Sequence, residues 1–260
     1  MQQERPGAPL PFKACENFRE LGGYTGCGGR HVKYGAFYRS PALANIKTPA
    51  DRARFEALGV RTVFDFRSEK ERTLAPDPDF PGVVNIPASA MLAEDGSEVD
   101  FDLEKLLRSE DGIRMLTEGV HESYARMPFG NPAYRALFGA IRAGQTPILF
   151  HCTAGKDRTG VLCAVLQRIA GFPEDDVMAG YLATNEVNAE ATTREMSQLE
   201  QGMTDEERAV LRSFLEARPT YLRAFFDEID GHAGGFSAYV RDALRLTPVQ
   251  VANLRELLNR

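Results

Sequence analysis

The stretch HCTAGKDRTG, residues 151–160, lies between two apolar segments, PILF (147–150) and VLCAVLQRIAG (161–171). The first segment is short and continuously apolar, as is typical of a buried strand. A loop that joins the end of a strand to a helix starting near Arg158 aims its backbone N–H groups into one concavity. Gly155 allows the positive φ angle that such a loop commonly requires. The stretch therefore predicts an anion-binding loop.

Strand and helix patterns alternate along the chain before this loop. Residues 47–59 predict a helix, because Thr48 stands as an N-cap ahead of a proline at the first helical position. Residues 60–68 and 82–89 have the pattern of buried strands, and residues 30–40 that of a hairpin. The alternation predicts an α/β fold with a mostly parallel central sheet flanked by helices.

The rest of the chain is helical in pattern and completes a single domain, which we expect over residues 1–260. Helical periodicity covers 98–142 and resumes after 172, which predicts a helical carboxyl-terminal part. Two capping boxes mark helix starts there, Thr204 with Glu207 and Thr247 with Gln250.

Residues 184–204 are polar and offer few side chains suited to a core. This composition is typical of a solvated helix. The alternative is a mobile helical cover over a site, and we place that candidate lid insertion at residues 184–216.

The overall charge narrows the class of partner. A net charge of −6 and a pI near 5.4 argue against binding to nucleic acid or to anionic membranes. The N-terminal sequence has no apolar segment of signal-peptide length, and no apolar run approaches the ~18 residues of a membrane span. We expect no stable membrane insertion.

The cysteine pattern bears on the compartment and on metals. Four cysteines without a CxxC pair are too few for a disulfide scaffold and favour a reducing, cytoplasmic location. Secretion without a signal peptide stays open, as does the oligomeric state. Cys15 and Cys27 have no matching Cys/His pair at zinc spacing, so we expect neither a metal nor another cofactor.

The loop residues suit covalent phosphoryl transfer. The field of an anion-binding loop stabilises a thiolate at Cys152, and Arg158 offers a planar fork for two phosphate oxygens. Lys156 adds positive charge, and the Thr159 hydroxyl is placed to reach the sulfur. Thiolate attack on phosphorus would give a phosphocysteine that water then hydrolyses. The stretch is not a Walker loop, because Asp157 stands where Ser or Thr is needed.

HCTAGKDRTG resembles the signature loop of cysteine-based protein tyrosine phosphatases. More narrowly, it is similar to bacterial tyrosine/phosphoinositide phosphatases of the mycobacterial tyrosine phosphatase B type. Three further stretches carry this resemblance: NFRELGGY (17–24), YRSPAL (38–43) and VFDFRSEKER (63–72). It runs from about residue 15 to beyond 185, whereas the carboxyl-terminal helices fit in character only.

The resemblance implies a role for each matching position. Cys152 would be the nucleophile, and His151 would help to set its thiolate. The positive charge of Lys156 would favour binding of highly anionic inositol head groups. Phosphoinositides as well as phosphorylated proteins are therefore expected substrates. The phosphate would be held by the Arg158 side chain and by backbone N–H groups of Thr153, Ala154, Gly155, Lys156, Asp157 and Arg158.

Two aspartates, Asp157 and Asp65, are candidates for the general acid that protonates the leaving group. The chain has no tryptophan and hence no Trp-Pro-Asp loop of the usual form, and the resemblance implies Asp157 instead. An aspartate entering a helix is also a routine cap. Asp65, at the end of a predicted parallel strand, is the second candidate, with an ion pair to a nearby arginine as its structural alternative.

Other charged residues and Cys163 have weaker claims on the site. Asp77 and Asp79 lie on a Pro-rich loop that could swing, although a solvated turn fits their sequence better. Cys163 is expected to pack in the core. The candidate charges at the rim of a phosphate pocket, with surface salt bridges as the alternative, are Arg19, Arg39 and Arg67.

The sequence thus favours an enzyme that hydrolyses phosphotyrosine, with phosphoserine, phosphothreonine and phosphoinositides as further candidate substrates. Two other classes compete with it. A pseudo-phosphatase would bind phosphorylated ligands without turnover, but it would not need the nucleophile Cys152. A rhodanese-like sulfurtransferase also uses a cysteine in an anion-binding loop, but the Arg158-Thr159 ending favours the phosphatase.

Overall fold

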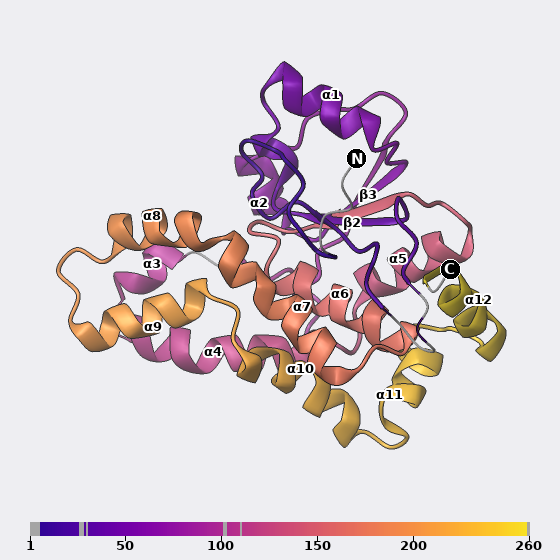
Figure 1. Cartoon of the computed structure of the whole chain (residues 1–260). Helices are drawn as coiled ribbons and strands as arrows, with labels where there is room; N and C mark the ends of the chain where they lie inside the picture. Colours follow the sequence, from indigo (N-terminus) through magenta and orange to yellow (C-terminus); the bar gives the residue numbers. More distant parts are fainter. Residues whose placement is uncertain (1–5, 26–28, 30, 101–102, 110, 259–260) are drawn as a thin grey trace.

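The central element is a five-stranded sheet with strand order β1-β2-β5-β3-β4 (Figure 1). The computed structural model describes residues 6–25, 29, 31–100, 103–109 and 111–258. Strands β2, β5, β3 and β4 are mutually parallel, and only β1 is antiparallel, so the prediction of a mostly parallel sheet is confirmed. The strands are β1 (Arg19–Glu20), β2 (Phe37–Ser40), β3 (Thr62–Asp65), β4 (Val84–Pro87) and β5 (Ile148–His151).

Two of the predicted strand assignments need correction. The strand within 82–89 exists as β4, but three of its four residues are exposed because it forms the edge of the sheet. The hairpin predicted within 30–40 is displaced. Its second strand, β2, pairs with β1, because the continuously buried residues of β2 need a partner on each side within the sheet.

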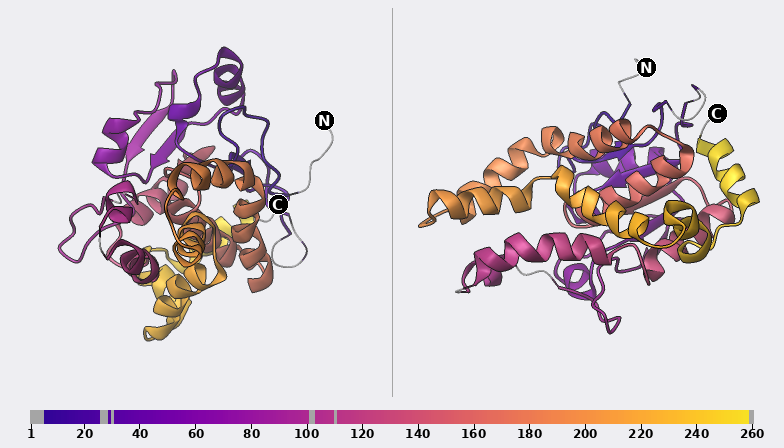
Figure 2. Two further views of the ribbon diagram at one scale, coloured as in Figure 1. Left: turned by 90° about the vertical axis from the view of Figure 1, so that its left-hand side faces the viewer. Right: turned by 90° about the horizontal axis from the view of Figure 1, so that it is seen from below.

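Helices cover both faces of the sheet (Figures 1 and 2). The helix predicted after Thr48 is present, and the Thr48 side chain caps it. Both predicted capping boxes are also formed. A short 3-10 helix spans Leu43–Asn45 and a π-helical turn spans Tyr239–Ala243. The α-helices are α1 (Pro49–Ala57), α2 (Glu69–Leu74), α3 (Leu103–Leu107), α4 (Gly112–Arg126), α5 (Pro132–Arg142), α6 (Asp157–Ala170), α7 (Glu174–Val187), α8 (Ala189–Leu199), α9 (Asp205–Leu215), α10 (Pro219–Gly231), α11 (Gly235–Ala238) and α12 (Pro248–Leu258).

The two faces of the sheet bury different sets of side chains, because successive residues of a strand point to opposite faces. Val63 and Leu149 belong to the cluster on the α1 side, together with Phe55. Phe64 and Phe150 belong to the larger cluster with the helices on the other side. Helix α6 is central to that cluster, with eleven of its fourteen residues buried, so the loop that precedes it has a rigid support.

The register of the sheet decides where the functional residues meet. His151 lies opposite Ser40 of β2 and opposite Asp65 of β3. The segments that follow β2, β3 and β5 therefore all begin at the edge of the sheet formed by the carboxyl ends of these strands, where α/β proteins commonly bind their ligands. The loop after His151 lies at this edge.

Helices α8 and α9 form a hairpin that projects beyond the sheet (Figures 1 and 2). Helix α9 packs against α4, and α3 and α4 extend in the same direction. Each of α8 and α9 contributes only one buried residue, Met196 and Leu211 respectively. The α8–α9 hairpin is thus fixed by few apolar contacts.

Candidate active site

The loop expected to bind phosphate, residues 152–158, turns sharply between β5 and α6, and we call it the phosphate loop. Cys152 directly follows β5 and is only 2% exposed. Gly155 has φ +64°, and a Cβ atom there would lie 2.6 Å from the carbonyl oxygen of Ser40. Both the backbone angle and the close approach require glycine at this position.

The carbonyl groups of the phosphate loop point back into the protein. Asn17 Nδ2 donates to the carbonyl oxygens of Ala154, at 3.2 Å, and of Gly155, at 3.1 Å. The Ala42 N–H donates to the Thr153 carbonyl at 3.0 Å. Backbone N–H groups then face the opposite way. Within the described part of the chain, no acceptor takes the N–H groups of Thr153, Ala154, Gly155 and Lys156.

Glu71 orients the arginine at the end of the loop. Arg158 donates to both carboxylate oxygens of Glu71, at 2.6 and 2.8 Å, and the Thr153 hydroxyl also donates to Glu71. Burial alone would raise the pKa of Glu71, but the hydrogen bonds and the charge of Arg158 lower it to about 2. Glu71 is therefore an anion throughout the neutral range and holds the guanidinium at the loop.

A buried ionic network lies behind the phosphate loop. Arg67 donates to both oxygens of Asp65, at 2.9 and 2.7 Å, and lies 2.9 Å from Asp77 Oδ1. His151 Nε2 lies 2.9 Å from Asp77 Oδ2, and the Ala44 N–H donates to Asp77 at 3.0 Å. Burial would raise the pKa of Asp77, but its contacts with His151 and Arg67 lower it. The ion-pair alternative for Asp65 is therefore what the structure contains, and the solvated turn predicted for Asp77 is wrong.

The three potential metal ligands of this network are Asp65, Asp77 and His151, whose ligand atoms lie within 4.8 Å of one another. The Arg67 guanidinium bonds to both carboxylates. A divalent cation would have to displace this guanidinium, so the group does not fit a metal and is an ion-pair network.

Asp157 is the first residue of α6, and it does not cap that helix. The N-cap position is Lys156, and no side-chain hydrogen bond caps the helix start. The Asp157 carboxylate instead accepts a hydrogen bond from the Tyr124 hydroxyl, at 2.5 Å from Oδ1. Its side chain is 33% exposed, which leaves it open toward solvent beside the phosphate loop.

Two further polar side chains of the stretch are Lys156, expected to add positive charge, and Thr159, expected to reach the sulfur. The Lys156 ammonium donates to the carbonyl oxygens of Phe214 and Glu216, at the end of the α8–α9 hairpin, and lies 3.5 Å from Asp157 Oδ1 of the loop. The Thr159 hydroxyl is fully buried and has no hydrogen-bond partner within the described part of the chain, so it makes no bond to Cys152.

The arginines predicted at a pocket rim are all buried. Arg39 donates to the Gly155 carbonyl behind the loop, and both Arg19 and Arg39 donate to the Thr184 hydroxyl of α7. Within the described ranges, no contact of Arg19 or Arg39 is with a carboxylate, whereas Arg67 binds Asp65 and Asp77. Cys163 is buried in α6, as predicted.

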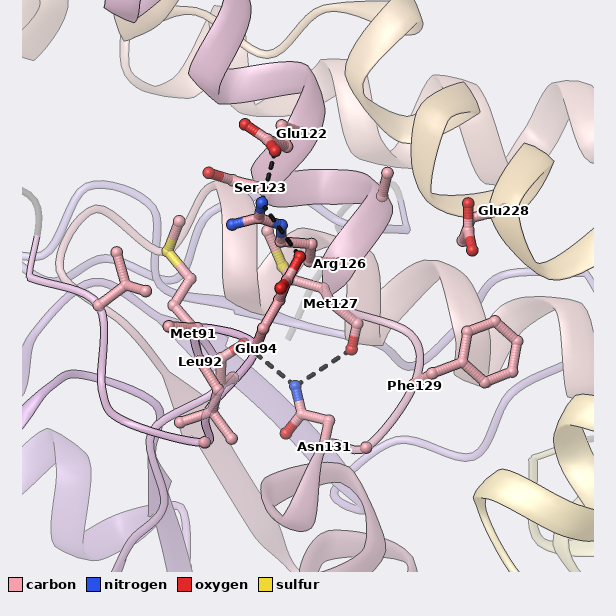
Figure 3. A pocket seen from close by; sticks show the side chains of 16 residues that line it. Met91, Leu92, Glu94, Glu122, Ser123, Arg126, Met127, Phe129, Asn131 and Glu228 are labelled. Carbon is pink, nitrogen blue, oxygen red and sulfur yellow. Dashed lines mark hydrogen bonds and ion pairs between the residues drawn. The ribbon is translucent and has the colours of Figure 1, made fainter.

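A separate cavity of about 420 Å³ lies between the segment after β4 and the junction of α4 and α5 (Figure 3). Met127 and Phe129 give it apolar walls, while Arg126 pairs with Glu122 and lies 3.8 Å from Glu94. No residue of the phosphate loop lines this cavity. It is distinct from the site built around Cys152.

A cysteine and an arginine on one loop, with N–H groups between them that bond to no acceptor within the described ranges, are features of cysteine-dependent phosphatases. The sequence model described as the tyrosine phosphatase family matches residues 10–260. A Cupriavidus necator protein named as a tyrosine-protein phosphatase is 35% identical over 250 residues, covering 95% of this chain and 86% of that protein. The chain belongs to the tyrosine phosphatase family, and it is a phosphatase enzyme.

Two further comparisons show more distant likeness. The Mycobacterium tuberculosis protein named triple specificity protein phosphatase PtpB is 28% identical over 244 residues, covering 82% of this chain and 87% of that protein. Among solved structures, P. aeruginosa TpbA is 17% identical and covers 70% of this chain and 90% of that chain, with a TM-score of 0.31.

Several residues of the site escaped prediction. Glu71 follows Ser68 at the spacing of a capping box, which its side chain does complete, so that signal indicated a helix start but not the contact with Arg158. Asn17 lies in NFRELGGY, whose first residue had no assigned role. Tyr124 carried no signal beyond its place in a helical pattern.

Proposed function

We propose that this phosphatase hydrolyses phosphate monoesters, phosphotyrosine in proteins foremost, through a phosphocysteine intermediate. The observation that carries the proposal is the placement of Cys152 beside free loop N–H groups and a guanidinium fixed by Glu71. The loop would bind the phosphate oxygens and stabilise the charge that develops on them in the transition state. The name of the mycobacterial relative, triple specificity, supports a test of further ester classes.

In the first step the Cys152 thiolate forms a bond to phosphorus while the bond to the ester oxygen breaks, and that oxygen takes a proton from Asp157. In the second step water attacks the phosphocysteine and gives a proton to the Asp157 carboxylate. The bond between sulfur and phosphorus then breaks, which releases inorganic phosphate and restores the thiolate.

The assignment of Asp157 as the acid is supported by its surroundings. It is partly exposed at the phosphate loop, whereas Asp65 is buried with both carboxylate oxygens bonded to Arg67. An acid must reach the leaving oxygen, and Asp65 lies in the network behind the loop. We therefore assign Asp65 the role of holding Arg67 within that network.

Asp157→Asn is expected to slow alkyl phosphates, such as phosphoserine peptides, by about 10²- to 10⁴-fold, the usual contribution of a general acid. A nitrophenyl phosphate should lose less than about 10-fold, because its phenolate leaves without a proton. Steady-state kinetics with both substrates on one preparation measures the difference. An equal loss for both leaving groups would contradict the role of Asp157 as the acid.

We also propose that residues 184–216 act as a lid. Lys156 of the phosphate loop binds the carbonyl oxygens of Phe214 and Glu216, so the hairpin ends directly at the loop. The ion pair between Arg194 and Glu16, 3.2 Å apart, is exposed and weak. Because the hairpin has few buried apolar contacts, it belongs to the part of the fold that opens at low free energy.

A single introduced tryptophan tests the lid, because the chain contains none of its own. Leu199→Trp, at the end of α8, is made in a Cys152→Ser background and titrated with a tyrosine phosphopeptide. We expect its fluorescence emission to shift on binding, whereas Phe236→Trp on α11 should not change. An unchanged emission at position 199 with bound peptide would refute movement of the hairpin.

The compartment is part of the proposal. The described cysteines Cys15, Cys152 and Cys163 are all free and buried, which supports a reducing environment such as the cytoplasm. Among the described residues, no helix is both long and apolar enough to cross a membrane.

A substrate panel tests the function as a whole. Tyrosine, serine and threonine phosphopeptides are compared with mono-, bis- and tris-phosphorylated inositol lipids, with Cys152→Ser protein as the blank. We expect the highest kcat/KM with phosphotyrosine, because Lys156 is held by lid carbonyls and can reach a second lipid phosphate only when the lid moves. Binding without turnover would indicate a pseudo-phosphatase, and sulfur transfer from thiosulfate a sulfurtransferase.

A further inference from the structure

Two buried tyrosines connect the interior of the helical layer to Asp157. Tyr124 of α4 is 2% exposed, and Tyr181 of α7 is 1% exposed. Their hydroxyl oxygens lie 2.7 Å apart, and the Tyr124 hydroxyl lies 2.5 Å from Asp157 Oδ1. The two contacts therefore form a continuous chain of hydrogen bonds that starts at Tyr181 in the core and ends at Asp157 of the phosphate loop.

The proton order along this chain follows from the pKa values of the phenols. Burial, followed by the charge of Asp157, raises the pKa of both Tyr124 and Tyr181, so neither ionises at neutral pH. An ionised carboxylate can only accept, so the one hydroxyl proton of Tyr124 points to Asp157. Tyr181 then donates to the oxygen of Tyr124, and the whole chain donates toward the carboxylate.

This order distinguishes the two oxygens of Asp157. Oδ1 accepts from Tyr124 and lies 3.5 Å from the Lys156 ammonium. Oδ2 has no hydrogen-bond partner within the described part of the chain, and the side chain is one-third exposed. Oδ2 is therefore the oxygen of Asp157 left open to donate a proton, since Oδ1 already accepts from Tyr124.

We propose that Tyr124, supported by Tyr181, is a positioning residue that fixes the Asp157 carboxyl with its proton-carrying oxygen, Oδ2, toward the leaving group. The inference rests on the proposed role of Asp157 as the general acid. A free carboxyl group rotates about its last bond and exchanges its two oxygens. The buried phenol removes this freedom, so the acid is oriented before the substrate binds.

A purely structural role would predict a different result. In that case the tyrosines would only join α4 and α7 to the start of α6, and their loss would lower stability and slow every substrate alike. Positioning of a proton donor instead affects substrates in proportion to their need for that proton.

Tyr124→Phe keeps the ring and removes the donor. We expect kcat for alkyl phosphates to fall about 10-fold or more, the effect of losing a hydrogen bond to a charged group, while a nitrophenyl phosphate changes less than about 3-fold. Tyr181→Phe should shift both in the same direction by a smaller factor. The slope of log kcat against leaving-group pKa, over a series of aryl and alkyl phosphates, measures the effect.

A single Tyr→Phe variant leaves the other buried hydroxyl unpaired, which can destabilise the protein. The double variant Tyr124→Phe/Tyr181→Phe avoids this, because it removes both hydroxyl groups together. Tyr239→Phe is the matched control, since Tyr239 is equally buried and its hydroxyl has no partner among the described residues. It should leave the slope unchanged.

Asp157→Asn separates the two hypotheses. In that background Tyr124→Phe should add no leaving-group dependence, because no acid remains to be oriented. If the rate loss of Asp157→Asn alone does not depend on the leaving group, the assignment of Asp157 as the acid fails. If Asp157→Asn shows it and Tyr124→Phe slows all substrates equally or not at all, the positioning role of Tyr124 is overturned and the acid assignment stands.

Discussion

Cys152→Ser is expected to abolish turnover while the protein still binds phosphorylated ligands. A serine hydroxyl needs a hydrogen-bonded base to become a nucleophile at neutral pH, and among the described residues no basic side chain is hydrogen-bonded to the sulfur of Cys152. The ring of His151 is directed elsewhere, with Nε2 2.9 Å from Asp77 and Nδ1 3.3 Å from the Cys152 carbonyl oxygen. The phosphate loop depends on backbone N–H groups and on Arg158, which the substitution leaves in place.

Two measurements check this result on the same preparation. Hydrolysis of a nitrophenyl phosphate should fall to the rate without enzyme, and calorimetry with a tyrosine phosphopeptide should still show binding. Cys15→Ser is the matched control, because Cys15 is buried and its thiol contacts the Ala42 carbonyl oxygen, which a hydroxyl can also do. More than a few per cent of residual activity in Cys152→Ser would refute the nucleophile.

Arg158→Lys should lower kcat/KM by about 10²- to 10³-fold although the charge is kept, the range found when a donor to a developing oxyanion is removed. The planar guanidinium bonds to both oxygens of Glu71 and still has N–H groups for phosphate. An ammonium group cannot make both contacts in that geometry, so the phosphate loses a two-point grip.

Arg168→Lys, in the same helix, is the control for this substitution. Arg168 forms a partly exposed pair with Asp230, at 2.9 Å, and lies outside the site. Its replacement should leave kcat/KM unchanged, and thermal unfolding should show that both variants fold. A near-normal kcat/KM for Arg158→Lys would mean that the arginine only supports the fold.

The parts of the site that are contiguous in sequence could be predicted, and those assembled by tertiary contacts could not. Strand, glycine turn and helix start lie within residues 147–171, and local patterns identify each of them. Glu71 lies 87 residues before the arginine it binds, and Asn17 lies 138 residues before Gly155. Such pairs depend on how the strands order in the sheet, which no local pattern specifies.

The buried arginines are a second example of tertiary contacts that local sequence patterns do not predict. Charged residues are almost never fully buried without a charged partner, so Arg19 and Arg39 were expected at a surface. The sequence could not show that Thr184 and backbone carbonyls would receive their N–H groups in the interior. The roles of Tyr124 and Tyr181 are hidden for the same reason, because a buried tyrosine in a helix usually belongs to the core.

Those two arginines link ligand binding to the stability of the folded chain. Burial and the neighbouring charge of Arg39 lower the pKa of Arg19 to about 9, so charge is disfavoured at this point. The described residues place no carboxylate in contact with either guanidinium. An oxyanion bound by the phosphate loop, as we propose, would supply negative charge on the other side of Gly155 and would bind the folded chain only. We therefore expect phosphate to stabilise the fold, so that the free energy of unfolding rises with the phosphate concentration.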